Sequence, residues 1–136
     1  MRGTLAAALL VALAGCASPA GRCPLPSQQP MTVAELFFGR DIAGRAPLNE
    51  SEWSHFVASA IAREFPDGFT VLDGYGEWRD PATNTIVNER TKVLVVDTPG
   101  NDLAERIQRV TGAYKRAYAQ NSVGVLTYSA CGAFRE

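Results

Sequence analysis

Residues 65–80 constrain the fold more than any other stretch, because a helix exit, a tight turn and a long strand follow one another there. Pro66 cannot continue a helix, and Asp67-Gly68 is a dipeptide typical of tight turns. The β-branched and aromatic residues that come next favour a strand, in which two glycines suggest a bulge or a close backbone approach. The stretch therefore predicts that a helix ends near residue 65 and that a long strand begins shortly afterwards.

A second strand is predicted at residues 85–97, and the turn at residues 80–84 joins the two into a hairpin. If the turn is centred on residues 82 and 83, Asp73 faces Lys92, residue 72 faces 93 and residue 78 faces 87. One face of the hairpin then gathers Leu72, Trp78, Val87, Val93 and Val95. The other gathers Val71, Leu94 and Val96 near Asp73, Tyr75, Glu77, Arg79, Arg90 and Lys92. A bulge at either glycine would shift part of this register by one residue.

Two amphipathic helices are predicted, one on each side of the hairpin. Asn49 and Glu52 have the spacing of a capping box, and an apolar stripe follows them at Trp53, Phe56, Val57, Ala60 and Ile61. The second helix is expected to be capped by Asp102, and its stripe is Leu103, Ile107, Val110, Tyr114 and Ala117. Further strands are predicted at residues 33–40 and 123–128.

The resulting order of strand, helix, strand, strand, helix, strand is that of a ferredoxin-like βαββαβ sandwich of the α+β class. The helix-free face of such a sheet is normally wet, yet Phe37, Val71, Leu94 and Val96 would lie on it. We therefore expect that face to be covered. A second copy could cover it in a homodimer of the dimeric α/β-barrel type, or the tether or a loop of the same chain could do so.

The N-terminal region has the layout of an export signal followed by a lipidation site. Arg2 gives a positive start, and the apolar run at residues 5–13 is too short to cross a bilayer. The quartet Leu13-Ala14-Gly15-Cys16 resembles the bacterial lipobox, which implies that Cys16 is acylated and becomes the mature N-terminus; an ordinary secreted protein is the alternative. We divide the chain into a signal peptide (1–15), a lipidated, proline-rich tether (16–32) and a single α+β domain (33–136).

This division predicts a lipid-anchored lipoprotein of the bacterial cell envelope that faces the periplasm. Ala17 stands where an aspartate resembles an inner-membrane retention signal, which favours the outer membrane. With Cys16 lipidated, Cys23 and Cys131 remain, and exported proteins retain disulfides. The first and fourth strands of the predicted fold are antiparallel neighbours, so we predict a bond between these two cysteines; two free thiols are the alternative.

Composition argues against several classes of partner. The formal net charge is -1 and no run of Lys or Arg is present, so no nucleic-acid partner is expected. The chain has 3 Cys and 1 His, without a CxxC or HxxxH pair, so neither a structural metal nor a cofactor is expected.

The expected ligand site is a polar patch on the helix-free sheet face, made of Glu35, Asp73, Tyr75, Glu77, Arg79 and Lys92. A charge among apolar neighbours is costly unless it is paired, so charges kept at such positions indicate a binding role. The competing interpretation is a salt-bridged sheet face in which Asp73 pairs with Lys92.

The patch and the anchor together favour a non-catalytic envelope lipoprotein that binds a small ligand or an envelope protein. The alternative is a cofactor-free enzyme of the dimeric α/β-barrel type, in which Glu35 or Glu77 acts as base and Arg79 or Lys92 binds an anion. A purely structural envelope protein is a third class, and it predicts no enclosed cavity. Whether the protein is an enzyme stays open at this point.

Several segments of the domain are distinctive as a set: Glu35-Leu36-Phe37-Phe38-Gly39-Arg40, a Trp-containing helix, Phe65-Pro66-Asp67-Gly68, Thr70-Val71-Leu72-Asp73-Gly74 and Gly76-Glu77-Trp78-Arg79. Together they resemble the domain of unknown function 3574 family of bacterial proteins. The resemblance spans about residues 33–129. It implies one domain and assigns no activity, cofactor or site residue.

Overall fold

The computed structural model describes residues 23–98 and 101–133, so the predicted signal peptide and Cys16 lie outside the described residues. Its strands are β1 (Gln29–Gly39), β2 (Thr70–Arg79), β3 (Ile86–Thr98) and β4 (Gly124–Gly132). The first helical segment comprises α1 (Glu50–Phe56), a π-helical turn η1 (Val57–Ile61) and α2 (Ala62–Glu64), and the second helix is α3 (Leu103–Tyr118). Because β1 begins at Gln29, residues 29–32, assigned above to the tether, belong to the sheet.

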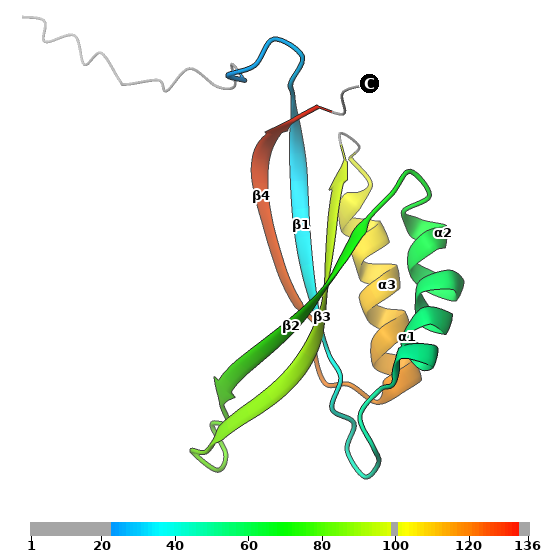
Figure 1. Cartoon of the computed structure of the whole chain (residues 1–136), viewed down its shortest axis with the longest axis vertical. Helices are drawn as coiled ribbons and strands as arrows, with labels where there is room; N and C mark the ends of the chain where they lie inside the picture. Colours follow the sequence, from blue (N-terminus) through cyan, green and yellow to red (C-terminus); the bar gives the residue numbers. More distant parts are fainter. Residues whose placement is uncertain (1–22, 99–100, 134–136) are drawn as a thin grey trace, which may run out of the picture.

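The four strands form one open antiparallel sheet in the order β2-β3-β1-β4, and the helices lie on one side of it (Figure 1). The predicted hairpin register is confirmed: Asp73 faces Lys92 and Trp78 faces Val87. The register continues unbroken through both glycines of β2, so no bulge shifts it. The chain thus has the predicted α+β composition, with two helical segments against a single antiparallel sheet.

The core lies between the helices and the even-numbered side chains of β1 and β3. Its fully or almost fully buried members from the sheet are Ala34, Leu36, Phe38, Leu94 and Val96. The predicted helical stripes pack against them through Trp53, Phe56, Ile61, Leu103, Val110 and Tyr114. The first stripe was therefore identified correctly from its spacing. In the second, Ala117 is exposed, and Tyr118 packs against the core at the end of the helix instead.

The two helix starts differ in how well the sequence predicted them. The capping box of α1 is present, because the Glu52 N–H donates to Asn49 Oδ1 and the Asn49 N–H donates to Glu52 Oε2, each at 3.0 Å. Asp102 stands at the N-cap of α3, but its side chain makes no capping bond. Its carboxylate instead pairs with Arg106 at 2.7 Å, one turn further along.

On the hairpin strands, the helices cover the face opposite to the one expected from sequence, whereas Glu35 and Phe37 of β1 are on the helix-free face as expected. Val71, Leu94 and Val96 pack into the core, and of the four apolar residues expected on the uncovered face only Phe37 lies there. The prediction is wrong because β3 carries aliphatic residues on both faces, so alternation fixed which residues share a face but not which face the helices cover. On the helix-free side, Val93 and Val95 remain partly exposed.

The β2–β3 hairpin extends beyond the helices, so its outer half has no helix over either face (Figure 1). Large apolar side chains are consequently exposed on both of its faces, including Tyr75, Trp78 and Ile86. At the opposite end of the sheet, the predicted disulfide is present between Cys23 and Cys131, with an S–S distance of 2.14 Å. Within the described ranges, no helix has the length and hydropathy needed to cross a membrane.

Candidate functional site

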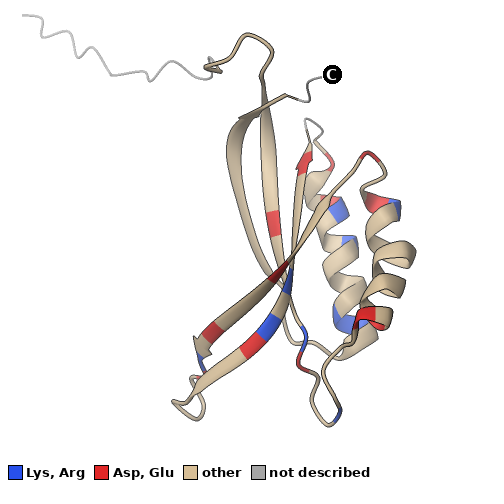
Figure 2. Ribbon diagram, viewed as in Figure 1, with Lys and Arg blue, Asp and Glu red and all other residues tan. Residues whose placement is uncertain are grey.

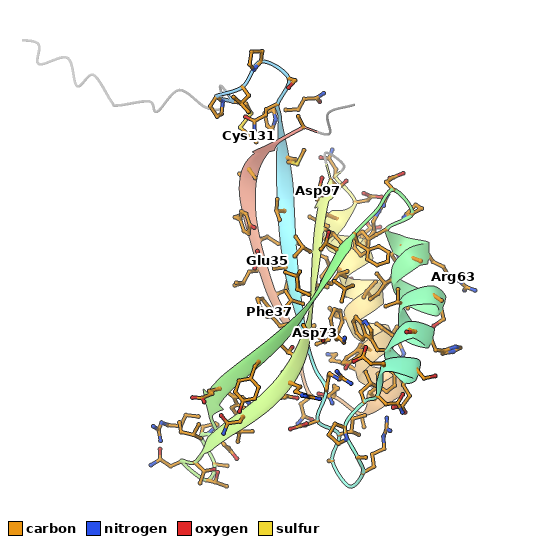
Figure 3. All side chains as sticks on the ribbon, in the orientation of Figure 1. Glu35, Phe37, Arg63, Asp73, Asp97 and Cys131 are labelled. Carbon is orange, nitrogen blue, oxygen red and sulfur yellow. A yellow bond between two sulfur atoms is a disulfide. The ribbon has the colours of Figure 1, made fainter. Side chains whose placement is uncertain are left out.

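The residues predicted to form one ligand patch lie on two different faces of the sheet. Glu35 is on the helix-free face, where its carboxylate accepts a 2.9 Å hydrogen bond from the Tyr128 hydroxyl (Figure 3). Asp73 and Lys92 lie on the helix-covered face. The other three predicted residues are on the same face as Asp73, because they follow it at every second position of β2: Tyr75, Glu77 and Arg79. The single patch is therefore wrong, because Glu35 faces Val95, whose side chain is on the other side of β3 from Lys92.

Lys92 forms the centre of a compact ion-pair cluster with Asp73 and Glu50. Figure 2 shows acidic and basic positions of β2 and β3 close together where the hairpin leaves the helices. Lys92 Nζ lies 2.6 Å from Asp73 Oδ1 and 2.9 Å from Glu50 Oε2. The Lys92 side chain is 5% exposed, whereas those of Asp73 and Glu50 are 76% and 65% exposed. Because the carboxylates face solvent and the ammonium is buried between them, Lys92 itself is not available to an anionic ligand. The salt-bridged interpretation is confirmed for Asp73 and Lys92.

Arg40 extends this cluster into the loop before α1. Its guanidinium donates to the Leu48 carbonyl through Nε at 2.8 Å and also through Nη2, and it pairs with Glu50 at 2.7 Å. Hydrogen bonds from Lys92 lower the pKa of the Glu50 and Asp73 carboxyls. Burial lowers the pKa of the Lys92 ammonium, but its hydrogen bonds to Asp73 and Glu50 outweigh burial, so the pKa is raised. These charges hold the loop against the sheet and thereby fix the start of α1.

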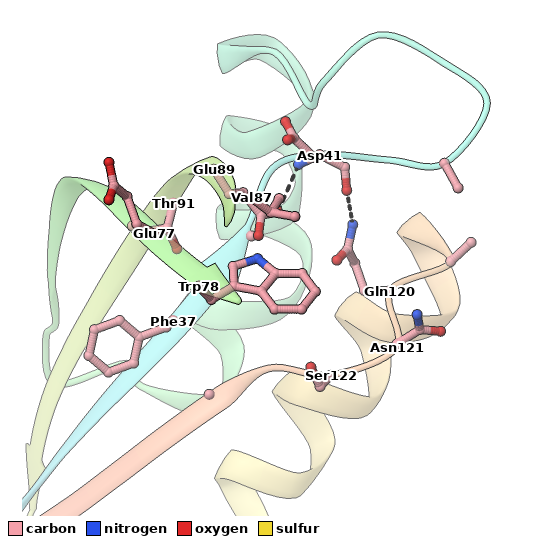
Figure 4. A pocket seen from close by; sticks show the side chains of 15 residues that line it. Phe37, Asp41, Glu77, Trp78, Val87, Glu89, Thr91, Gln120, Asn121 and Ser122 are labelled. Carbon is pink, nitrogen blue, oxygen red and sulfur yellow. Dashed lines mark hydrogen bonds between the residues drawn. The ribbon is translucent and has the colours of Figure 1, made fainter. Parts of the chain in front are cut away.

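A groove of about 640 Å³ lies on the helix-free face, at the end of the sheet remote from the disulfide (Figure 4). We call it the Trp78 groove. Side chains of β1, β2 and β3 form its floor, and the loops at residues 41–43 and 119–124 form its rim. The residues that line it include Phe37, Trp78, Val87, Glu89, Thr91 and Gln120. Its size lies within the range of about 300–1,000 Å³ that is usual for small-molecule sites.

Glycines on both neighbouring strands make room for Glu89 at the centre of the groove. Across the hairpin, Glu89 faces Gly76, which has no side chain to cover the carboxylate. On β1, a Cβ added to Gly39 would lie only 2.3 Å from Glu89 Oε1. A side chain at position 39 would therefore clash with the Glu89 carboxylate, so glycine at this position leaves room for it.

The rim loops are tied to each other and to Glu89 by hydrogen bonds. The Asp41 N–H donates to Glu89 Oε1 at 3.1 Å, and Gln120 Nε2 donates to the Asp41 carbonyl at 2.6 Å (Figure 4). Ala119, at the end of α3, is left-handed with φ 50°, which turns the chain toward this rim. Burial raises the pKa of the Glu89 carboxyl despite the bond from Asp41. Relative to an exposed carboxyl, burial disfavours the ionised form of Glu89, and groups perturbed in this way are concentrated at functional sites.

Two aromatic rings give the groove its apolar surface. Trp78 is 48% exposed, and it lines the groove together with Phe37; Figure 4 shows the indole directed toward the rim at residues 120–122. The side chain of Glu77 points away from the indole in the same view, as strand alternation requires. The combination can hold a planar molecule against the rings while Glu89 accepts hydrogen bonds from it.

Sequence reasoning missed the groove residues Phe37, Asp41, Trp78, Glu89 and Gln120 as site candidates. The correct hairpin register did place Trp78 and Val87 on one face, and extending it by two residues would have added Glu89 to that face. The rim could not be found in this way, because residues 41–43 and 119–124 meet only in the folded chain. In the part of the chain that the structure describes, no three His, Cys, Asp or Glu residues are arranged to hold a metal ion.

Comparisons with known proteins give one family and a distant fold likeness. The family model described as "Protein of unknown function (DUF3574)" matches residues 33–134. No curated protein matches the sequence. A phage SAM lyase in complex with S-methyl-5'-thioadenosine is similar in fold at 13% identity, with a TM-score of 0.57, covering 78% of this chain and 93% of the lyase. The phage SAM lyase in its apo state gives 14% identity and a TM-score of 0.54, covering 86% of this chain and 100% of the other.

Proposed function

Because the chain belongs to this DUF3574 family, whose description names no activity, we propose from the chain's own geometry that it is a non-catalytic lipoprotein that binds a small aromatic molecule. The observation that carries the proposal is the Trp78 groove. It combines two aromatic rings with a carboxylate and a hydrogen-bonded rim, at a volume that suits one small molecule. A purely structural envelope protein would have no need of such a cavity.

The envelope part of the proposal rests on the lipobox-like quartet. The position of the disulfide decides which end of the domain a lipid on Cys16 would hold at the membrane. Cys16 precedes Cys23 by only seven residues, which span at most about 25 Å. Cys23 is bonded to Cys131, and Cys131 faces Pro30 at one end of the sheet. Gly124, which lines the groove, is at the other end of β4. A lipid on Cys16 would therefore hold the disulfide end near the membrane and direct the groove away from it, toward the periplasm.

Lipidation of Cys16 is tested by metabolic labelling. Cells that express the protein are given a fatty-acid probe such as a palmitate analogue, and the label is expected on the wild type and not on Cys16→Ala. The Cys16→Ala protein should also leave the membrane fraction. Equal labelling of both proteins, or a soluble mature wild type, would contradict the anchor. Separation of inner from outer membranes in the same cells tests the outer-membrane assignment.

Binding in the groove is tested with Trp78→Ala. We expect this change to weaken the binding of aromatic small molecules by about tenfold, because stacking on an aromatic side chain is worth about 1–3 kcal/mol. S-methyl-5'-thioadenosine is the first probe, since a protein of similar fold was obtained in complex with it. Titration followed by NMR measures the affinity and shows which residues respond.

The matched control is Tyr75→Ala. Tyr75 is an exposed aromatic residue on the same strand, 68% exposed, but its side chain is on the opposite face of the hairpin. Its removal should leave the affinity unchanged, and thermal melts of both variants show that each is folded. If Tyr75→Ala weakens binding as much as Trp78→Ala does, or if no aromatic probe shifts the signals of Trp78 and Phe37, the groove is not the ligand site.

The second candidate function is a cofactor-free enzyme that uses a carboxylate base, and the raised pKa of Glu89 favours it. Glu89 replaces Glu35 and Glu77 in that role, because Glu35 is hydrogen-bonded to Tyr128 and the Glu77 side chain is on the opposite face of β2 from Trp78. The lyase named among the fold neighbours makes incubation with SAM the natural assay. Product formation that Glu89→Gln abolishes would establish this function in place of simple binding.

We further propose that the fold is of the ferredoxin-like type and that a second copy covers the helix-free face, as in dimeric α/β-barrel assemblies. Exposed apolar side chains on that face support the dimer: Leu72, Trp78, Leu126 and Tyr128. A facing sheet would also close the Trp78 groove. Sedimentation of the protein as a monomer at high concentration would contradict this assembly.

A further inference from the structure

The described strands carry their Lys and Arg residues on only one face of the sheet. On the hairpin, alternation places the basic residues Arg79, Arg90 and Lys92 on the helix side. The described strand residues on the helix-free side include three carboxylates and no Lys or Arg: Glu35, Glu89 and Asp97. This arrangement leaves the Trp78 groove next to negative charge that no basic side chain of its own face offsets.

The lining of the groove repeats this bias at close range. The charged residues among its described lining are all acidic, namely Asp41, Glu77 and Glu89. Of the two glutamates, only Glu89 has its side chain on the helix-free face, because Glu77 alternates to the other face of β2. Glu89 lines the groove from β3 and pairs with Gly76 on β2, which has no side chain to cover the carboxylate. The Trp78 indole and the Phe37 ring are on the same surface (Figure 4). A carboxylate beside aromatic faces is a favourable environment for an organic cation, since the ring quadrupole and the carboxylate attract the same charge.

We propose that the Trp78 groove selects organic cations that carry an aromatic or quaternary group over neutral and anionic molecules of the same size. The proposal rests on the proposed function, because it names the ligand charge for the same groove. Trp78 and Phe37 supply contact area for a ligand of any charge, and Glu89 supplies the discrimination. A bound cation also replaces the hydration that the Glu89 carboxylate has lost by burial, which favours its ionised form.

Anionic ligands are disfavoured by the same geometry. The Lys and Arg residues of the hairpin are on the helix side: Lys92 is buried between Asp73 and Glu50, Arg79 donates to the Asn84 carbonyl at 3.0 Å, and Arg90 faces Tyr75. None of the three is on the helix-free face. An anion in the groove would therefore face Glu89 with no compensating charge, and like charges at short range repel.

The test uses three probes that share a benzene ring and differ in charge: benzyltrimethylammonium, benzamide and benzoate. NMR titration of the full mature protein, with Cys16 replaced by Ser so that it remains in solution, follows the Trp78 indole signal. We expect the cation to bind about tenfold more tightly than benzamide, from the range of cation–π energies at partly desolvated sites, and benzoate to bind most weakly. Glu89→Gln should reduce the affinity for the cation about fivefold and leave that for benzamide unchanged, while Glu77→Gln should change neither.

The outcomes separate this inference from the proposed function. If benzamide or S-methyl-5'-thioadenosine moves the Trp78 signal but the cation binds no more tightly than benzamide, the charge selectivity is wrong and the binding site stands. Cation preference that survives in Glu89→Gln likewise overturns the assignment of selectivity to Glu89. If none of the probes moves the Trp78 signal, the groove fails as a ligand site and both proposals are rejected.

Discussion

Replacing Cys23 and Cys131 together by serine is expected to lower the free energy of unfolding by about 4–5 kcal/mol, because the bond closes a very long loop. The two residues are 108 positions apart, so nearly the whole domain lies within the loop. Opening it returns that conformational entropy to the unfolded chain. In the folded chain, Gln28 Nε2 donates to the Cys131 carbonyl at 3.1 Å beside the bond, and the ladder between β1 and β4 continues from Gln29 onward.

Urea unfolding followed by circular dichroism measures this loss, with Cys16 replaced by Ser in every sample so that lipid does not interfere. The wild-type pair under reducing conditions is the matched comparison, since it opens the loop without changing a side chain. Reduced wild type and the double variant should unfold at nearly the same urea concentration. A loss of less than about 1 kcal/mol, or identical midpoints for the oxidised and reduced wild type, would be incompatible with a bond that constrains the unfolded chain.

The elements of this fold were predictable where the signal is local. The capping box at Asn49 and Glu52 involves residues only three apart, and the position of the hairpin turn alone sets the pairing of Asp73 with Lys92. The disulfide was predictable for a different reason. Only two cysteines remain once Cys16 is assigned to lipid, and the order of elements predicts that the ends of β1 and β4 lie together.

The covered face of the sheet was not predictable, because β3 offers two nearly equivalent apolar faces. Leu94 and Val96 became core, whereas Val93 and Val95 stayed partly exposed, and nothing in the strand itself distinguishes the two pairs. That choice depends on how the helices cross the sheet, which is a property of the assembled layers. Once the helices cover one face, strand alternation decides on which face each charged side chain of the hairpin lies. The residues of the predicted patch therefore lie on two different faces.

The Trp78 groove lay beyond sequence reasoning for a related reason. The room for Glu89 comes from Gly76 on β2 and Gly39 on β1, which are neighbours of Glu89 only after three strands have paired. The rim adds two loops that are distant in sequence, joined by the bond from Gln120 to the Asp41 carbonyl. Each of these residues is unremarkable alone, and their combination makes the site.

Two adjacent phenylalanines on β1 belong to different surfaces, Phe38 to the core and Phe37 to the Trp78 groove. Phe38→Ala is expected to reduce the free energy of unfolding by about 3–5 kcal/mol, the usual loss for a buried phenylalanine. The Phe38 side chain is fully buried, with its ring centroid 5.5 Å from that of Trp53, 6.0 Å from that of Phe56 and 4.8 Å from that of Tyr114. Because these rings come from α1 and α3, the cavity left by alanine would loosen both helices from the sheet. Urea unfolding measures the loss.

Phe37→Ala is the matched control, since it removes the same side chain one position away on the opposite face. Phe37 lies at the groove and is only partly buried, so its loss should lower the free energy of unfolding by about 1 kcal/mol. It should instead weaken the binding of aromatic probes, which Phe38→Ala should affect only through the folded fraction. If Phe37→Ala proved as destabilising as Phe38→Ala, the helix-free face would itself be buried in solution, as a facing second copy would make it. If Phe38→Ala lost less than about 2 kcal/mol, the assignment of the core to the even-numbered face of β1 would be wrong.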